Sequence, residues 1–97
     1  MKFDKEDIIE FLKANKHYLK ENFEITSISL FGSFARGEET DESDIDIFVE
    51  MPPDLHKLVG LIGYLENAFN KKVHVVRNRQ NLSPRLTKHI FREKVNA

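Results

Sequence analysis

The stretch between residues 25 and 49 decides the fold, and it reads ITSISLFGSFARGEETDESDIDIFV. Apolar and small hydroxyl residues alternate from Ile25 to Phe31, which predicts a strand with one buried face. Gly32-Ser33 ends that strand, and Phe34-Ala35-Arg36-Gly37 is long enough only for one helical turn before glycine stops it. An acidic loop then leads to a second strand at residues 44–49.

The second strand starts with two carboxylates on one face. Alternation over Asp44-Ile45-Asp46-Ile47 places the aspartates on one side of the strand and the isoleucines on the other. The two carboxylates are roughly 7 Å apart along the backbone and lean to one side, so they can hold a hard divalent cation through oxygen. Like charges this close repel each other, and a cation that also holds phosphate oxygens removes that penalty.

The Gly-Ser turn complements the carboxylates. Gly32 lets the backbone approach a phosphate, and the N–H groups that open the short helix point at an anion. Ser33 adds a hydroxyl donor, while Arg36 either contacts phosphate or pairs with a local acid. Phosphate contacts and a cation site would thus lie at the ends of adjacent strands, which is the outline of a phosphoryl- or nucleotidyl-transfer site.

Helical and strand patterns continue on both sides of this stretch. Asp4 is a candidate N-cap, and the apolar spacing after it predicts an amphipathic helix over residues 5–21. A helix is predicted over residues 54–69, a strand over residues 72–76 and, after Ser83-Pro84, a terminal helix to about Val95. The apolar stripe of the first helix is Ile8, Leu12 and Leu19, and that of the second is Leu55, Leu58, Val59, Ile62, Leu65 and Phe69.

This order of elements predicts an α+β fold, with a small mixed β-sheet and helices packed on it. The 97 residues, of which 40% are hydrophobic, predict a single domain over 1–97. The absence of cysteine excludes disulfides, thiolate catalysis and thiolate metal sites. No stretch approaches the roughly 20 apolar residues of a membrane span, so we expect a cytoplasmic protein without a membrane partner.

The net charge of −1 conceals an asymmetry between the two parts of the chain. Residues 1–70 hold 7 basic and 15 acidic side chains, whereas residues 71–97 hold 8 basic and 1 acidic. A pI near 6.4 argues against general nucleic-acid binding. The basic segment could still meet phosphates or an acidic partner, or it could simply solvate the terminal helix.

With these residues in place, the sequence resembles the minimal nucleotidyltransferase family of the DNA polymerase beta superfamily. The hallmark of that family is Gly-Ser, here Gly32-Ser33, followed at this distance by Asp-x-Asp, here Asp44-Ile45-Asp46. The resemblance implies transfer of AMP from ATP with magnesium, for which manganese is an alternative. It also implies a partner, a HEPN-type toxin, for which the nucleotidyltransferase is the antitoxin, either by adenylylating it or by binding it.

The resemblance further implies a third carboxylate on the third strand, and here the sequence departs from the family. The segment Lys72-Val73-His74-Val75-Val76 carries a histidine at that position. A histidine brings no negative charge and is a poor ligand for magnesium. Three interpretations of His74 stay open: a structural strand residue, a substitute base, and the remnant of a metal site.

Two functions of different classes follow. The first is a metal-dependent nucleotidyltransferase in which Asp44 and Asp46 are catalytic and the nucleotide is bound by Gly32, Ser33 and Arg36. Its metal ligands would be Asp44 and Asp46, joined by His74 if the remnant still binds. The second is a module that has lost catalysis and binds its partner, with a basic contact surface at the end of the chain. That surface would comprise Arg85, Lys88 and Arg92.

A third possibility is transfer onto a small molecule such as an aminoglycoside, and the motif alone does not exclude it. Arg77 and Arg79 follow the third strand, where they either reach the nucleotide or a partner or lie in a solvated loop. The phenylalanines near the motif are expected in the core and the remaining histidines on the surface. These are Phe31, Phe34, Phe48 and Phe69, and His17, His56 and His89.

Overall fold

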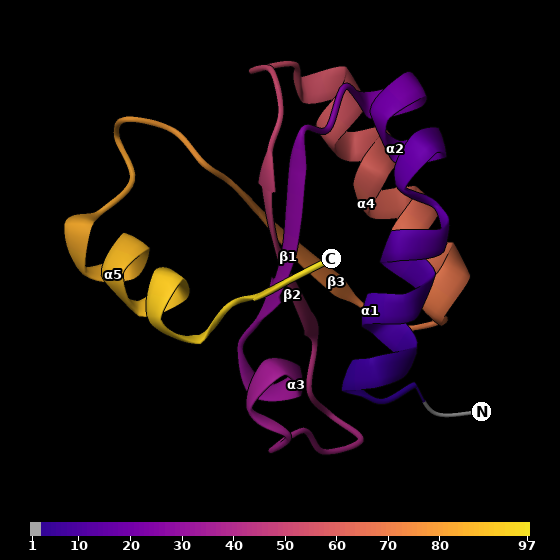
Figure 1. Cartoon of the computed structure of the whole chain (residues 1–97), viewed down its shortest axis with the longest axis vertical. Coiled ribbons are helices and arrows are strands. Elements are labelled where there is room, and N and C mark those ends of the chain that lie inside the picture. The colour runs from indigo at the N-terminus through magenta and orange to yellow at the C-terminus, as the bar shows by residue number, and fades with distance from the viewer. Residues whose placement is uncertain (1–2) are drawn as a thin grey trace.

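The structure is a computed structural model that describes residues 3–97 (Figure 1). Four strands form one sheet in the order β3-β2-β1-β4, in which β2 and β3 run parallel and the other neighbours antiparallel. The predicted small mixed sheet with helices packed on it is therefore confirmed. The elements are α1 (Lys5–Ala14), α2 (Lys16–Phe23), β1 (Ser27–Phe31), α3 (Ser33–Arg36), β2 (Ile45–Glu50), α4 (Leu55–Phe69), β3 (Val73–Arg77), α5 (Pro84–Glu93) and β4 (Val95–Asn96).

The helices cover the two faces of the sheet unequally. Figure 1 shows α1, α2 and α4 together on one side of the strands and α5 alone on the other. The larger core lies under the three helices and includes Ile45 and Ile47, both fully buried. A smaller cluster under α5 joins Phe31, Phe48 and Ile90. The alternation predicted for the second strand is confirmed, because Asp46 lies on the α5 side, away from the larger core.

The predicted helix over residues 5–21 is in fact two helices. Asp4 caps α1 as expected, because its side chain accepts a hydrogen bond from the Asp7 N–H at 2.9 Å. The helix breaks at Asn15, whose side-chain amide donates to the Phe11 carbonyl at 2.8 Å. A short polar side chain that bonds the preceding turn competes with continued helix, which explains the break. The predicted stripe of Ile8, Leu12 and Leu19 is buried.

Helix α4 agrees with the prediction in its bounds and differs in its buried face. Asp54 caps it by accepting from the Lys57 N–H at 3.1 Å. Leu55 and Val59, which we expected in the buried stripe, are 74% and 60% exposed. The residues that α4 buries completely or nearly so are Leu61, Leu65 and Phe69. Apolar residues on several sides of one helix leave its rotation undetermined by periodicity alone.

The C-terminal segment contains one element that the sequence did not predict. Helix α5 has Pro84 in its first turn as expected, although the Ser83 side chain makes no capping hydrogen bond, and it ends at Glu93 rather than near Val95. The chain then extends into β4, which pairs with β1 through Ser29↔Asn96 and Leu30↔Val95. This return to the sheet fixes the end of α5 beside the Gly-Ser turn. No helix among residues 3–97 combines the length and the apolar character that crossing a bilayer requires.

Candidate functional site

The Gly-Ser turn follows β1 directly and opens a helix of one turn. Gly32 has φ 78° and ψ −157°, a backbone conformation that residues with a Cβ rarely adopt. Helix α3 begins at Ser33 and is stopped by Gly37 in the left-handed conformation, as the sequence predicts. The phenylalanine inside the turn, Phe34, is 3% exposed and anchors α3 in the larger core.

The two halves of the motif meet at Gly32 and Asp46. The antiparallel register pairs Phe31 with Asp46, so the second aspartate stands beside the turn. A Cβ on residue 32 would lie 2.1 Å from Asp46 Oδ2, which means that the carboxylate occupies the space a side chain would need. The sequence spacing therefore corresponds to a direct approach between turn and carboxylate in the fold.

Asp46 lies in an environment that disfavours its negative charge. Its side chain is 26% exposed, and burial raises the pKa of its carboxyl above the ordinary value. The neighbouring charges of Asp44 and Glu93 raise that pKa further, whereas His74 and Arg36 oppose them. Asp44 lies immediately before β2 and is partly exposed. A cation held by the two aspartates would relieve this repulsion.

His74 is the cross-strand neighbour of Asp46. The parallel register pairs the two residues, and His74 Nδ1 lies 3.9 Å from Asp46 Oδ1. The imidazole is 75% exposed, so solvent reaches it. Within residues 3–97 there is no group of three histidine or acidic side chains arranged to hold a metal ion. The described part of the protein thus offers two carboxylates and one imidazole, which is fewer oxygen ligands than magnesium takes.

A residue that sequence reasoning missed, Glu93, lies at the centre of the site. Its Oε1 accepts a hydrogen bond from the Gly32 N–H at 2.9 Å, and its Oε2 accepts one from Arg36 Nη1 at 2.9 Å. Burial alone would raise the pKa of Glu93, but the hydrogen bonds from Gly32 and Arg36, together with the nearby His89, lower it below the ordinary value. The sequence signal was weak, because one acid at the end of a basic helix is typical of a solvated surface.

Arg36 is engaged by two acids rather than left open for phosphate. Its Nε donates to Glu38 Oε1 at 2.7 Å, and Nη1 donates to Glu93. The hydrogen bonds to Glu38 and Glu93 raise the pKa of the guanidinium. Of the two roles predicted for Arg36, pairing with a local acid is what the structure contains.

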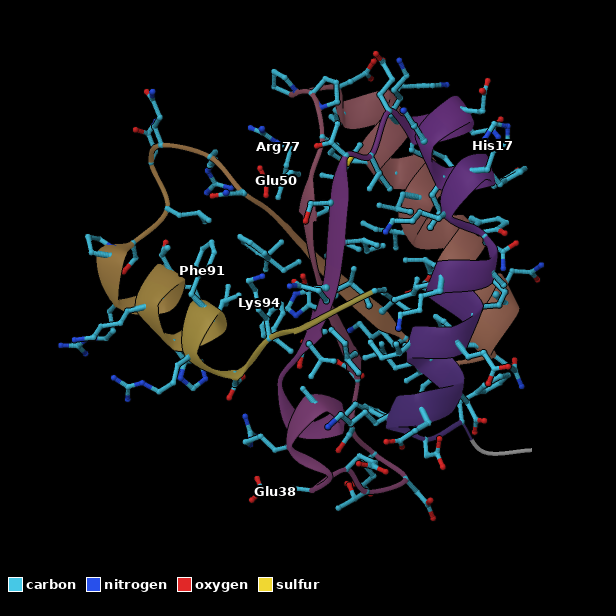
Figure 2. The ribbon with its side chains drawn as sticks, in the orientation of Figure 1. His17, Glu38, Glu50, Arg77, Phe91 and Lys94 are labelled. Atoms are coloured by element: carbon cyan, nitrogen blue, oxygen red, sulfur yellow. The ribbon has the colours of Figure 1, made fainter. Side chains whose placement is uncertain are left out.

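Arg77 lies away from this site. Register pairs it with Val49, near the far end of β2, where its guanidinium donates to the Met51 carbonyl at 3.4 Å. Figure 2 shows Arg77 and Glu50 near one end of the sheet, with Glu38 beyond the other end. Arg77 thus lies three residues along β3 from His74, and its guanidinium donates to the Met51 and Asn78 carbonyls.

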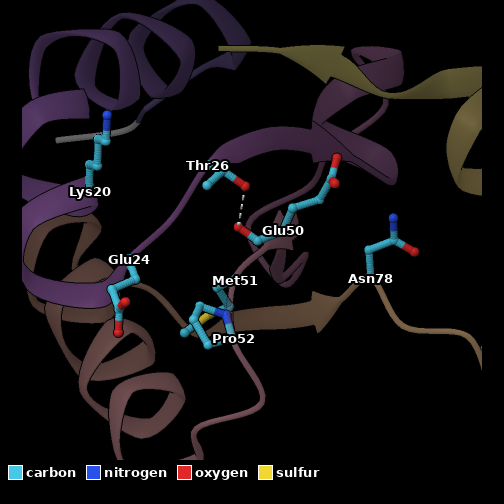
Figure 3. A pocket seen from close by; sticks show the side chains of 7 residues that line it. All are labelled: Lys20, Glu24, Thr26, Glu50, Met51, Pro52 and Asn78. Atoms are coloured by element: carbon cyan, nitrogen blue, oxygen red, sulfur yellow. Dashed lines mark hydrogen bonds between the residues drawn. The ribbon is translucent and has the colours of Figure 1, made fainter.

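A cavity of about 530 Å³ also lies at that far end. Lys20, Glu50 and Asn78 are among the residues around it (Figure 3). Thr26, which also lines the cavity, donates its hydroxyl to the Glu50 carbonyl at 3.2 Å. Because Ser27 pairs with Glu50 while Phe31 pairs with Asp46, the length of β1 separates this cavity from the motif. Because of this position, the cavity is not the candidate active site.

Comparison with known proteins agrees with the motif. Residues 6–96 match the family described as polymerase beta, nucleotidyltransferase. The protein adenylyltransferase MntA of Thermococcus cleftensis is 37% identical over 92 residues, which cover 93% of this chain and 92% of that protein. Among solved structures, one assigned as a minimal nucleotidyltransferase superposes with a TM-score of 0.79 at 27% identity, covering 96% of this chain and 95% of that one.

A second solved structure bears on the ligand and the partner. It is a toxin–antitoxin crystal structure with AMP-PNP, and one of its chains superposes with a TM-score of 0.69 at 25% identity. The match covers 97% of this chain and 72% of that one. Both structures share the fold of this chain over nearly its whole length.

Proposed function

Because this chain belongs to the nucleotidyltransferase family of polymerase beta, we propose that it transfers AMP from ATP to a hydroxyl group on a protein partner. The observation that carries the proposal is the direct approach of the Asp46 carboxylate to Gly32. This approach places a carboxylate that could bind a cation next to a turn that could bind phosphate. Transfer from a metal-bound triphosphate requires these two groups side by side.

The binding roles are divided among the residues of the motif. Asp44 and Asp46 offer the hard oxygen ligands that magnesium and manganese prefer. Such an ion, when bound, would neutralise phosphate charge and orient the triphosphate. Ser33 would donate its hydroxyl to a phosphate oxygen. Arg36 is paired with Glu38 and Glu93, so it would reach a phosphate with the N–H groups that these acids leave free. Gly32 has no side chain, which leaves room for the Asp46 carboxylate beside the turn.

The transfer itself makes one bond and breaks one. The acceptor hydroxyl oxygen attacks the α-phosphorus of ATP, and the bond from that phosphorus to the bridging oxygen of the β-phosphate breaks, releasing pyrophosphate. The hydroxyl proton must pass to a base. His74 is suited to this step, because its imidazole is exposed and its Nδ1 lies 3.9 Å from Asp46 Oδ1. The imidazole would then be the substitute base rather than a metal ligand.

For the acceptor, we propose a toxin of the HEPN type, which this chain would neutralise by adenylylation. The support is the similarity to an MntA protein adenylyltransferase and to a chain of a toxin–antitoxin structure with AMP-PNP. A reaction that consumes ATP and a protein toxin favours activity in the cytoplasm. A small-molecule acceptor stays an alternative that the acceptor assay would reveal.

The test measures ATP binding first and transfer second. ATP is titrated calorimetrically into the protein with magnesium and then with manganese, for the wild type and for the Asp44→Ala, Asp46→Ala double variant. The protein encoded by the neighbouring gene is then incubated with ATP and each protein, and its mass is recorded. We expect binding and an AMP adduct only with the wild type. No binding under either metal would overturn the proposal.

A second candidate function rests on His74, which stands where family members carry an acid. In this alternative the fold neutralises its partner by occupying the partner's surface, with exposed α5 residues as the contact. These residues are Arg85, Lys88 and Arg92. The alternative predicts that the Asp44→Ala, Asp46→Ala variant neutralises the toxin as well as the wild type does. It is wrong if that variant still binds the toxin but no longer neutralises it.

A further inference from the structure

We propose that Glu93 is a positioning residue, whose carboxylate holds the Gly-Ser turn and Arg36 in the arrangement that receives the triphosphate of ATP. The inference rests on the nucleotidyl transfer proposed above and adds to it a residue outside the motif. Glu93 is the last residue of α5, far along the chain from Gly32.

One carboxylate spans the whole of α3. Gly32, the N-cap, donates its backbone N–H to Glu93 Oε1, and Arg36, the last helical residue, donates Nη1 to Oε2. Both donor–acceptor distances are 2.9 Å, within the range of charge-assisted hydrogen bonds. The two ends of the turn are therefore fixed to the same rigid group.

A helix as short as α3 needs such support. An isolated helix of four residues is unstable in water, because fixing the first turn gains only one backbone hydrogen bond. In α3 the first bond runs from the Arg36 N–H to the Gly32 carbonyl at 3.1 Å, and after it the Gly37 N–H donates to the Phe34 carbonyl at 3.3 Å and the Glu38 N–H to the Ser33 carbonyl at 2.9 Å. Gly32 also has a positive φ. Glycine adopts positive and negative φ about equally well, so its backbone needs an outside contact to keep this conformation. Glu93 adds a constraint from outside the turn at the Gly32 N–H, which has no acceptor within α3.

Of the two acids on Arg36, Glu93 is the one that fixes its direction. The Glu38 side chain is 66% exposed, so water competes for it and the ion pair contributes little. The Glu93 side chain is 13% exposed and also holds the Gly32 N–H. Low exposure and a second hydrogen bond leave the carboxylate little freedom to move. The guanidinium is thus aligned with the turn, and not merely attracted to it.

The experiment compares Glu93→Gln with Glu38→Gln, a matched loss of one carboxylate on the same guanidinium. Glutamine keeps an acceptor for the Gly32 N–H, so a folded variant is expected. ATP with magnesium is titrated calorimetrically into each protein, and toxin adenylylation gives KM for ATP and kcat separately. Amide hydrogen exchange is measured on the same proteins without nucleotide.

We expect Glu93→Gln to raise the Kd for ATP about tenfold or more, since charge-assisted hydrogen bonds are lost. KM should rise more than kcat falls, and the amides of residues 32–37 should exchange faster. For Glu38→Gln the Kd should change less than about threefold. If Glu93→Gln binds ATP as tightly as the wild type, the inference is overturned and the proposed function stands.

Two further outcomes separate the inference from the function on which it rests. If the wild type binds no ATP, the proposed function fails, and with it the nucleotide role of Glu93. If the variant does not fold, hydrogen exchange of the wild type tests the inference. The Gly32 amide of the wild type must be protected from exchange and become more protected when ATP is added. Rapid exchange at Gly32 in the folded wild type would overturn the inference.

Discussion

The carboxylate of Asp46 leaves no room for a side chain on residue 32, because a Cβ there would lie 2.1 Å from Asp46 Oδ2. Residue 32 must also hold φ at 78°, a conformation that L side chains rarely adopt. Glycine is thus required at this position for two independent reasons. The contact with Asp46 concerns the site itself, because a side chain on residue 32 would push the Asp46 carboxylate out of its position.

Replacement of Gly32 by alanine tests both reasons. The strained backbone should lower the free energy of unfolding by roughly 1–3 kcal/mol. The Asp46 carboxylate must rotate away from the new methyl group, and a displacement of about 1 Å at a reacting centre costs on the order of 100-fold in rate. Urea unfolding measures the first effect, and toxin adenylylation measures the second.

The matched control is Gly37→Ala. Gly37 also has a positive φ, 72°, but no atom lies within 4 Å of a Cβ added there. This variant should be destabilised by about 1 kcal/mol and retain ATP binding. Equal losses of ATP affinity in the two variants would mean that backbone strain, and not the contact with Asp46, explains the effect at residue 32.

Asp46→Asn should stabilise the protein while abolishing its nucleotide binding. Burial raises the pKa of Asp46 in the folded state, so its ionised form is disfavoured there at pH 7. An uncharged amide removes that penalty, and the urea midpoint at pH 7 should rise. As pH falls through the raised pKa, the wild-type carboxyl takes up a proton and the difference between the two proteins should shrink.

Glu50→Gln is the control for Asp46→Asn, because it removes an exposed carboxylate from the same strand. Its unfolding free energy should stay within about 0.5 kcal/mol of the wild-type value. A lower midpoint for Asp46→Asn than for the wild type at pH 7 would contradict the prediction.

Glu93 should show the opposite dependence on pH. Its pKa is lowered in the folded state, so its ionised form stabilises the fold above the ordinary carboxyl pKa of 4.5. The wild type should be more stable than Glu93→Gln at pH 7. The difference should disappear as pH falls below 4.5 and through the lowered pKa. Urea unfolding of both proteins from pH 7 to pH 3 provides the measurement, and a difference independent of pH would contradict it.

The sequence predicted those parts of the fold in which a local pattern has one solution. Alternation assigned Ile45 and Ile47 to the core, and the Asp4 cap set the start of α1 correctly. The rotation of α4 was wrong at Leu55 and Val59, because that helix carries apolar residues on several sides and only packing selects the buried one. Strand β4 was missed because two residues are too short for a period to appear.

The candidate site was predictable where its residues lie close together in the sequence. Gly32 and the aspartates share one turn and the next strand, so their spacing carried the information. Glu93 reaches the same point from the other end of the chain, and its partners follow from the pairing of β4 with β1. A contact of this kind depends on tertiary structure, and no local pattern in the sequence contains it.

His74→Asp should add a third carboxylate to the site and raise activity in the presence of metal. The parallel register places residue 74 opposite Asp46, so a carboxylate there would complete a set of three acids on adjacent strands. Without metal, the added repulsion beside Asp46 should lower the urea midpoint, because like charges directly opposite each other are destabilising. Magnesium or manganese should reverse that loss, which gives a readout independent of catalysis.

His74→Asn removes the imidazole without adding a negative charge, because the asparagine side chain is neutral. Comparison with His74→Asp therefore separates loss of the imidazole from gain of a carboxylate. If the imidazole accepts the hydroxyl proton, this variant should lose about 100-fold in kcat or more, with an unchanged Kd for ATP. Single-turnover adenylylation of the toxin at saturating ATP and metal measures this rate for the wild type and for both variants. Equal rates for His74→Asn and the wild type would exclude the substitute base. A lower rate for His74→Asp than for His74→Asn, at saturating metal, would exclude a second metal held by residue 74.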